Sequence, residues 1–183
     1  MSGDRQVKVL FDEAAIARRT EALAREIAAA DPKDLLVAAI LKGSFMFAAD
    51  LLRALHRAGL EPQVEFFQLS SYLEGTVSSG RVKILRDIES SVRGRDVLLV
   101  DDILESGRTL AFAKDLLAAR GARRVLICIM LEKPGKRAVS IDADFVGFTC
   151  PDVFVVGYGM DVAHSYRELP FIGRVVTSRD EAA

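Results

Sequence analysis

The sequence predicts an α/β fold: a single domain built on a central, mostly parallel, twisted sheet with helices on its faces. Three continuous apolar runs, at residues 35–41 (LLVAAIL), 97–100 (VLLV) and 125–131 (VLICIML), are typical of strands buried on both faces. They alternate with helical patterns, as in parallel sheets that helices cover. The length of 183 residues, without an internal repeat or low-complexity linker, fits one domain with one core.

The predicted elements follow one another in a regular order. An edge strand comes first, and Asp12 can then cap a helix, because an aspartate side chain accepts hydrogen bonds from the free N–H groups at a helix start. Gly59 and Gly121 each follow a helical pattern, where glycine commonly ends a helix. Strands are predicted at 7–11, 35–41, 64–69, 82–88, 97–100, 125–131, 145–148 and 153–158, and helices from 12 to about 30, from 45 to about 56 and from 110 to about 120.

Residues 70–81 (SSYLEGTVSSGR) interrupt this order. The segment is rich in serine and glycine and poor in apolar anchors. Such a composition favours a loop over a packed element. We expect a mobile loop here between two strands.

The composition is that of a globular protein and excludes several classes of partner. Half of the residues are hydrophobic, 28% are charged, and the formal net charge is −1. Without a basic excess, nothing favours nucleic acid or an acidic membrane surface as a partner. No apolar run approaches the roughly 20 residues that span a bilayer, and the first eight residues lack a signal-peptide stretch. A cytoplasmic protein is expected, with Cys128 and Cys150 buried and reduced.

The strongest functional signal is the segment 97–109, VLLVDDILESGRT. An apolar strand leads into two adjacent carboxylates, Asp101 and Asp102, and a turn with Ser106 and Gly107 leads into a helix. The helix start offers free N–H groups, and small residues let a phosphate approach them closely. Carboxylates accept hydrogen bonds from ribose hydroxyls, so the pattern suits a sugar phosphate. Alternatively, the acids only end a strand and cap a helix; a Walker-type loop is excluded because its Gly-Lys-Ser/Thr signature is absent.

A second polar interruption, Lys42-Gly43, follows the first buried run in the same way. Ligands of open parallel sheets bind beyond the carboxyl ends of the strands. We therefore expect Lys42-Gly43 and Asp101-Asp102 to lie at this edge of the sheet, although Leu41-Lys42-Gly43 by itself favours a plain loop.

The segment VLLVDDILESGRTL resembles the motif with which type I phosphoribosyltransferases bind phosphoribosyl pyrophosphate (PRPP). Other segments are similar to the hypoxanthine–guanine branch of that family, and together they cover nearly the whole chain. They are LKGSFMFAADL (41–51), SSY (70–72), VKILRD (82–87), DFVGFTCPDVFVVGYGMD (144–161) and YRELPFIG (166–173).

The resemblance implies an enzyme of purine salvage. It would transfer the 5-phosphoribosyl group from PRPP to N9 of hypoxanthine or guanine, giving IMP or GMP and pyrophosphate. Mg²⁺ is the implied cofactor, and a homodimer or homotetramer is the implied assembly. The implied architecture is a core at about 35–131 beneath a small hood over the base site, formed by the N-terminal segment and about 132–183.

The resemblance also implies how PRPP is held. Asp101 and Asp102 should meet the ribose 2′- and 3′-hydroxyls, directly or through magnesium and water, and residues 105–109 should hold the 5′-phosphate. The Leu41–Lys42 peptide is expected to be cis. The PRPP-binding set is Lys42, Gly43, Asp101, Asp102, Ser106, Gly107, Arg108, Thr109 and Arg167.

Further roles concern the lid, the metal and the base. Ser71 and Tyr72 should close over the pyrophosphate, and a second magnesium should bind Asp161, with Asp101 and Asp102 as the other metal ligands. The implied purine contacts are Lys133 with O6, Phe154 by stacking, and the Val155 backbone with the pyrimidine edge. Taken alone, Lys133 would be a solvated loop lysine and Phe154 an ordinary core aromatic residue.

Glu105 is the residue that departs most meaningfully from the family pattern. Aspartate is usual at this position, where the carboxylate is the implied catalytic contact of purine N7, with Asp102 as the other catalytic candidate. Ser106 and Arg108 replace the commoner Thr and Lys, and they keep the hydroxyl and the charge. Three alternatives stay open: a xanthine-preferring enzyme, a PRPP-sensing regulator that binds nucleic acid, and a catalytically degenerate relative.

Overall fold

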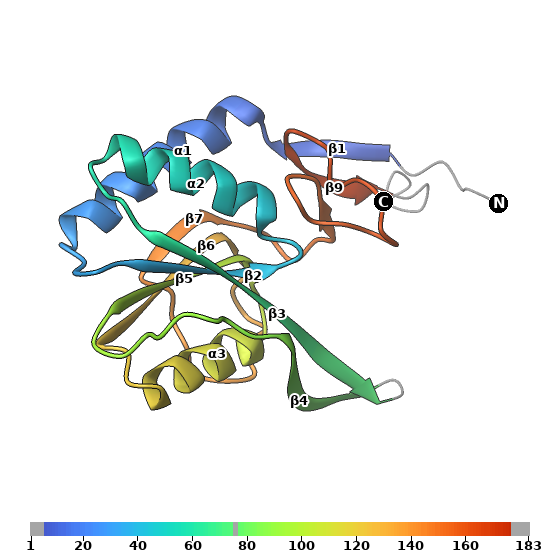
Figure 1. Cartoon of the computed structure of the whole chain (residues 1–183). Helices are drawn as coiled ribbons and strands as arrows, with labels where there is room; N and C mark the ends of the chain where they lie inside the picture. Colours follow the sequence, from blue (N-terminus) through green and yellow to red (C-terminus); the bar gives the residue numbers. More distant parts are fainter. Residues whose placement is uncertain (1–5, 75–76, 177–183) are drawn as a thin grey trace.

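The computed structural model describes residues 6–74 and 77–176, with the backbone alone for 70–74 and 77–81. The chain forms two sheets and three helices within this part (Figure 1). The elements in chain order are β1 (Gln6–Phe11), α1 (Glu13–Ala29), β2 (Leu36–Leu41), α2 (Phe45–Arg57), β3 (Gln63–Glu74), β4 (Val77–Arg86), β5 (Asp96–Leu104), α3 (Arg108–Ala119), β6 (Arg124–Glu132), β7 (Phe145–Thr149), β8 (Val155–Val156) and β9 (Ile172–Val176).

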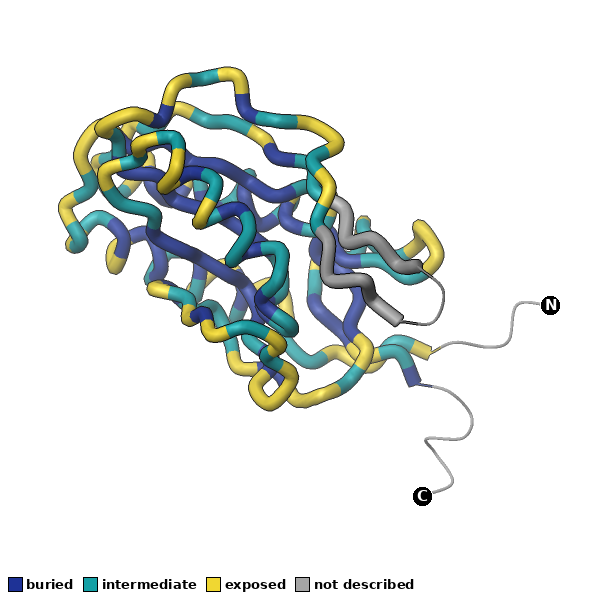
Figure 2. Tube along the Cα trace, turned by 90° about the horizontal axis from the view of Figure 1, so that it is seen from below, coloured by how far each residue is buried: buried dark blue, intermediate teal, exposed yellow. Residues whose placement is uncertain are grey.

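The main sheet has six strands in the order β4-β3-β2-β5-β6-β7. All neighbours pair in parallel except β3 and β4, which form an antiparallel hairpin. The three apolar runs that predict buried strands form β2, β5 and β6 at the centre, which Figure 2 shows as the most buried part of the chain. This arrangement confirms the predicted α/β class.

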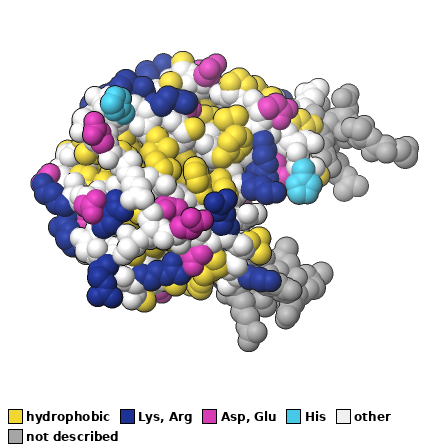
Figure 3. All heavy atoms as spheres, viewed as in Figure 1, with side chains coloured by type: hydrophobic (Ala, Val, Ile, Leu, Met, Phe, Trp, Pro, Cys, Tyr) yellow, Lys and Arg dark blue, Asp and Glu magenta, His cyan; other side chains and the backbone are white. Residues whose placement is uncertain are grey.

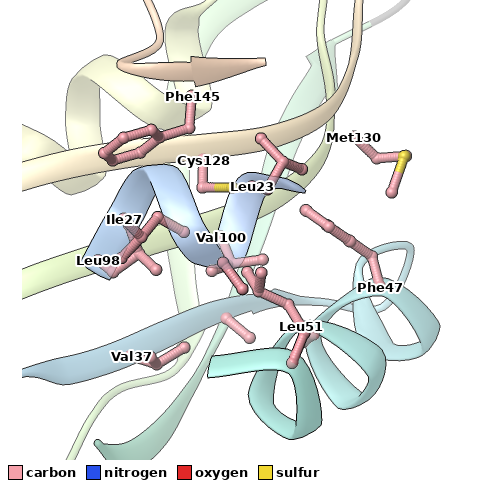
Figure 4. Close-up of a cluster of buried hydrophobic side chains, with 14 of the residues drawn as sticks. Leu23, Ile27, Val37, Phe47, Leu51, Leu98, Val100, Cys128, Met130 and Phe145 are labelled. Atoms are coloured by element: carbon pink, nitrogen blue, oxygen red, sulfur yellow. The ribbon is translucent and has the colours of Figure 1, made fainter. Parts of the chain in front are cut away.

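Helices cover both faces of this sheet. Helices α1 and α2 pack on one face and α3 packs on the other (Figure 1). The Asp12 carboxylate accepts a hydrogen bond from the Ala15 N–H at 2.7 Å, so the predicted cap of α1 is confirmed. Figure 4 shows Leu23 of α1 and Leu51 of α2 facing Val100 of β5, on the same side of the sheet as the buried Cys128.

A three-stranded sheet, β1-β9-β8, lies beside the carboxyl ends of the main strands (Figure 1). Strand β1 pairs with β9 along its length, which joins the two ends of the described chain. The sequence does not predict β9, because this strand is short, contains a glycine, and finds its partner more than 160 residues away in β1. This small sheet forms the hood.

The structure corrects the prediction for residues 70–81. Strand β3 continues to Glu74 and β4 begins at Val77, so most of this segment is a β-hairpin rather than an irregular loop. The antiparallel ladder satisfies the backbone N–H and C=O groups of residues that have few apolar side chains of their own. Mobility of the segment stays a prediction, and the side chains of Ser71 and Tyr72 lie outside the described part.

Two boundaries also differ from the predicted ones. Strand β5 does not end at Val100 but carries Asp101 and Asp102 within it, because both continue the ladder toward Leu104. Strand β7 falls within the range 132–183 that is expected for the hood, yet it pairs with β6 in the main sheet.

The topology creates one switch point, between β2 and β5. These strands are neighbours, but α2 follows β2 onto one face and α3 follows β5 onto the other. The chain therefore diverges beyond their carboxyl ends and leaves a crevice, the usual ligand site of such sheets.

In the described residues, no helix is long and apolar enough to cross a membrane.

Candidate active site

A cleft of 680 Å³ opens at this switch point, between the carboxyl ends of the strands and the hood. It gathers residues from segments that are far apart in the sequence. Lining residues come from the carboxyl ends of β2, β4 and β5, from the middle of β3, from the turn after β6, and from the hood and the segment before it: Leu41, Lys42, Gly43, Gln68, Leu69, Leu85, Asp102, Ile103, Glu105, Lys133, Lys136, Asp152, Val153, Phe154, Val155, Met160, Asp161 and Arg167.

A smaller hollow of 200 Å³ adjoins the cleft at the start of α3. Gly107 begins this helix with a φ of +79°, and a Cβ there would lie 2.5 Å from Ile141 Cγ2, so only glycine fits the turn. The N-cap glycine supplies no side-chain cap, and the Arg108 N–H donates to Ser106 Oγ at 3.5 Å, so the positive end of the helix borders the hollow. The hollow is lined by Asp101, Ile103, Leu104, Glu105, Ser106, Gly107, Thr109 and Leu110, and it suits a phosphate group.

The acidic pair sits between the cleft and this hollow. Asp101 is only 8% exposed. Its carboxylate accepts a hydrogen bond from the Asp102 N–H at 3.0 Å, and the Asp102 carboxylate accepts one from the Ile103 N–H at 2.9 Å. Burial raises the pKa of both carboxyls, and the negative charge of Asp102 raises the pKa of Asp101 further. Two buried, adjacent carboxyl groups with raised pKa values favour ligands that bring a cation or hydroxyl donors.

Asp101→Asn is expected to stabilise the ligand-free protein while impairing PRPP use. The pKa of Asp101 lies above its ordinary value of 3.8, so this group contributes stability at low pH that is lost as the pH rises through its folded pKa. At neutral pH the buried charge is a cost that Asn removes, and its amide oxygen can still accept from the Asp102 N–H. We expect the melting temperature to rise by at least about 2 °C at pH 7.5, and less at pH 4.

Differential scanning calorimetry checks this result, with the exposed Asp115 changed to Asn as the control. An equal or lower melting temperature for Asp101→Asn at pH 7.5 would show that the buried charge does not destabilise the fold.

The Lys42-Gly43 turn after β2 is fitted tightly against the acidic pair. The Leu41–Lys42 peptide is cis, as predicted. A Cβ on Gly43 would lie 1.7 Å from Asp102 Oδ2, and a Cβ on Gly159 would lie 2.2 Å from the Gly43 carbonyl oxygen. Glycine at both positions lets the turn pack between β5 and the hood, which leaves Lys42 exposed at the cleft wall.

The residues expected at the purine lie together at the other end of the cleft. Lys133 is only 6% exposed, and its N–H donates to the Leu104 carbonyl at 3.0 Å, so the alternative of a solvated loop lysine is wrong. Phe154 is 57% exposed, so it is not a core residue. Val155, which follows it, is buried in the hood. A buried cation and an exposed ring on one cleft can hold a flat, polar heterocycle.

Glu105 lies between the phosphate hollow and this purine end. Its Oε1 is 3.5 Å from Lys136 Nζ and 4.0 Å from Lys133 Nζ. The Arg137 guanidinium donates to the carbonyls of Glu105 and Leu104, each at 2.9 Å, which fixes the backbone of this turn. The carboxylate is therefore held at the cleft by a fixed backbone and two nearby cations.

Asp161 and Arg167 face the acidic pair from the hood. Arg167 Nη2 lies 2.7 Å from Asp161 Oδ1, and its Nη1 donates to the Gly159 carbonyl at 2.6 Å. The other Asp161 oxygen accepts from the His164 N–H at 2.8 Å. The two predicted residues thus line the same cleft as an ion pair.

The structure brings together most residues that the sequence singles out, and it adds some that the sequence does not. Arg108 starts α3 but, within the described chain, is not among the residues lining either cavity. Lys136, Asp152 and Arg137 are additions. After Lys133, a second and a third cation within five residues of the end of β6 were the available signal for Lys136 and Arg137. Asp152 carried none beyond its position two residues before Phe154.

Comparisons with known proteins agree with this geometry. Residues 6–163 match the family of the phosphoribosyl transferase domain. The chain is 42% identical over 173 residues to the hypoxanthine phosphoribosyltransferase of Escherichia coli, covering 93% of this chain and 96% of that protein. It is 46% identical over 167 residues to the bifunctional protein TilS/HprT of Listeria innocua, where it covers 91% of this chain but spans only 25% of that protein.

A solved structure supports the same assignment. A hypoxanthine-guanine phosphoribosyltransferase from Bacillus anthracis superposes with a TM-score of 0.87 at 40% identity, covering 93% of this chain and 100% of that one. Sequence and fold likeness thus extend over nearly the full length of the Escherichia coli and Bacillus anthracis proteins. The chain belongs to the phosphoribosyltransferase family, and within it to the hypoxanthine phosphoribosyltransferases.

Proposed function

We propose that this enzyme transfers the 5-phosphoribosyl group of PRPP to N9 of hypoxanthine or guanine, releasing pyrophosphate and IMP or GMP in purine salvage. One observation carries the proposal. A phosphate-sized hollow at a helix start shares Ile103 and Glu105 with an adjoining cleft, whose lining includes Asp102 of the acidic pair, the buried Lys133 and the exposed Phe154. These groups suit the phosphate, the ribose hydroxyls and the purine of a nucleotide.

The test is nucleotide formation from PRPP, magnesium and one purine at a time, with products identified by mass spectrometry. IMP and GMP are the expected products. Xanthine as the only productive base would instead make this a xanthine-preferring enzyme, and no product with any purine would contradict the proposed transfer.

PRPP would be bound by the residues that follow β2 and β5, the two strands at the switch point, and by Arg167. The N–H groups of the turn at 106–109 would bind the 5′-phosphate, with the Ser106 and Thr109 hydroxyls and Arg108 in support. Asp101 and Asp102 would accept from the ribose hydroxyls. Lys42 and Gly43 on one wall, with Arg167 on the other, would bind the pyrophosphate.

The purine would lie between the hood and the strand ends. Phe154 would stack on its face, and the Val155 backbone would contact the pyrimidine edge. Lys133 would donate to O6, since a buried ammonium needs an acceptor and a 6-oxopurine supplies one. Hypoxanthine and guanine share this oxygen.

The chemistry then follows from the groups around C1′. As the bond from C1′ to the pyrophosphate oxygen breaks, positive charge develops on the ribose, and purine N9 attacks from the opposite side. Glu105 would accept the N7 proton as the imidazole ring of the purine loses electron density. Closure of the hairpin that carries Ser71 and Tyr72 would exclude water, which otherwise would hydrolyse the ribosyl cation.

The acidic residues fit a magnesium site. Mg²⁺ in nucleotide enzymes is usually bound by one or two carboxylates, with substrate phosphates and water as its other ligands. Asp101 with Asp102, and Asp161 opposite them, supply that number of carboxylates. Bound magnesium would neutralise charge on the leaving pyrophosphate.

Asp161→Asn is expected to raise the magnesium concentration for half-maximal activity at least about tenfold. The affinity for the purine should change little, because Asp161 lies on the pyrophosphate side of the proposed site. Initial rates over a magnesium titration, with purine binding measured by calorimetry, check this result. The control is Asp142→Asn, an exposed aspartate. Full activity of the unaltered enzyme in excess chelator would exclude the proposed metal requirement.

The family resemblance further suggests a homodimer or homotetramer. Light scattering after size-exclusion chromatography determines the number of subunits directly.

A further inference from the structure

A lysine–aspartate pair at the mouth of the cleft has no part in the proposed function so far. Lys136 Nζ lies 2.6 Å from Asp152 Oδ1. Lys136 belongs to the turn after β6 and Asp152 to the segment between β7 and β8, so the pair connects two walls of the cleft that face the base. Both side chains are about half exposed, so an ion pair here adds little to stability by itself.

Lys136 also lies close to Glu105, the proposed general base of the reaction. Lys136 Nζ lies 3.5 Å from Glu105 Oε1, and Lys133 Nζ lies 4.0 Å from that same oxygen. For each of the two lysines, the closest approach to Glu105 is at Oε1. With Oε1 held by the two ammonium groups, Oε2 is the oxygen that we assign to proton transfer.

Lys136 matters because Lys133 cannot hold Glu105 during the reaction. Lys133 is the proposed donor to purine O6, so its ammonium turns toward the base when a purine binds. Glutamate has one more torsion to immobilise than aspartate, and each free torsion lowers the fraction of time spent in the reactive geometry. A cation that stays with Glu105 after the purine arrives would offset this loss.

Asp152 is placed to keep Lys136 where Glu105 needs it. The hydrogen bond that Lys136 donates to the Asp152 carboxylate raises the pKa of Lys136, and Glu105 adds a smaller effect in the same direction. Lys136 is therefore an ammonium at neutral pH. Its position between two carboxylates makes it a bridge rather than a solvated lysine.

We infer that Lys136, anchored by Asp152, is a positioning residue that holds the Glu105 carboxylate for proton transfer from the purine. The inference rests on the proposed role of Glu105. It explains how a chain with the longer acid at this position can still present a fixed base, since the anchor reaches the oxygen that does not react.

Lys136→Met tests the inference because it keeps the length of the side chain and removes the charge. We expect kcat to fall about threefold to tenfold with the KM for PRPP within about twofold of the unaltered enzyme. Lys136→Arg should restore at least about half of kcat, since a guanidinium can bridge both acids. Lys33→Met is the matched control: Lys33 pairs with Asp31 at 2.5 Å at the opposite edge of the sheet.

The decisive measurement repeats Lys136→Met in the Glu105→Asp background. In Glu105→Asp the shorter carboxylate lies farther from Lys136. Lys136→Met should therefore lower kcat by less than about twofold in that background. An equal loss in both backgrounds would mean that Lys136 does not act through Glu105. Unchanged kcat in Lys136→Met alone, or a Lys136→Arg enzyme as slow as Lys136→Met, would also overturn the inference.

Glu105→Gln separates this inference from the proposed function. If Glu105→Gln is slow and Lys136→Met is normal, only the positioning role fails. If Glu105→Gln is itself normal, the proposed role of Glu105 fails and the positioning role fails with it. Thermal melting of each variant shows whether a loss of rate reflects folding.

Discussion

Glu105→Gln is expected to lower kcat by at least about tenfold, because general-base help of this kind contributes roughly 10²–10⁴ in rate. The amide keeps the size and a hydrogen-bond acceptor but cannot take the N7 proton. PRPP binding should change little, since the side chain lies on the purine side of the turn that would hold the phosphate. Stopped-flow or steady-state kinetics with hypoxanthine, and calorimetry with PRPP, separate the two effects.

Glu105→Asp is the matched comparison. It keeps the charge and has the reach that is usual in the resembling family, so activity should be retained or improved. A Glu105→Gln enzyme that turns over normally would reduce Glu105 to an acid at a helix start. The proton acceptor would then be Asp102 or water.

Adenine should be rejected by a factor of about 10⁴ or more in kcat/KM relative to hypoxanthine. Lys133 is a buried donor in the cleft wall, and adenine presents an amino donor where the 6-oxopurines present an acceptor. A site built around one hydrogen bond discriminates at this level, because the wrong substrate leaves a buried polar group unpaired. Guanine should be a substrate, and xanthine is expected to be poor. Competition assays with paired purines measure these ratios directly.

Lys133→Met should lower kcat/KM for hypoxanthine. It should also reduce the ratio of kcat/KM for hypoxanthine to kcat/KM for adenine. The methionine fills the space without the charge, so neither base is favoured by a donor. Lys33→Met serves again as a control far from the cleft. Comparable turnover of adenine and hypoxanthine by the unaltered enzyme would rule out Lys133 as the selecting residue.

The fold class could be predicted because its signals are local. The apolar runs that form β2, β5 and β6 and the helix cap at Asp12 each depend on a few neighbouring residues, and each agrees with the structure. The strand β9 could not be predicted, because its partner β1 lies at the other end of the chain. The extension of the two hairpin strands into residues 70–74 and 77–81 was missed because its backbone pairing does not depend on apolar side chains.

The residues of the candidate site likewise fall into those that a local motif predicts and those that it does not. The acidic pair and the turn after it form one contiguous motif, and the predicted residues Lys42, Lys133 and Phe154 were carried by family resemblance rather than by local chemistry. Their local patterns favoured a plain loop, a solvated lysine and a core aromatic residue. The structure shows instead a buried Lys133 and an exposed Phe154, because the hood and the strand ends together decide what is covered.

By itself, the sequence determined the central strands, the helices and the order of polar residues at strand ends, since these follow from periodicity and from the chemistry of adjacent residues. Only the tertiary structure decided which charges meet. Lys136 contacts Glu105, 31 positions earlier, and Asp152, 16 positions later, because parallel strands bring distant carboxyl ends to one edge of the sheet. Burial and distance, which set the charge state of the acidic pair and the anchoring of Glu105, exist only after that assembly.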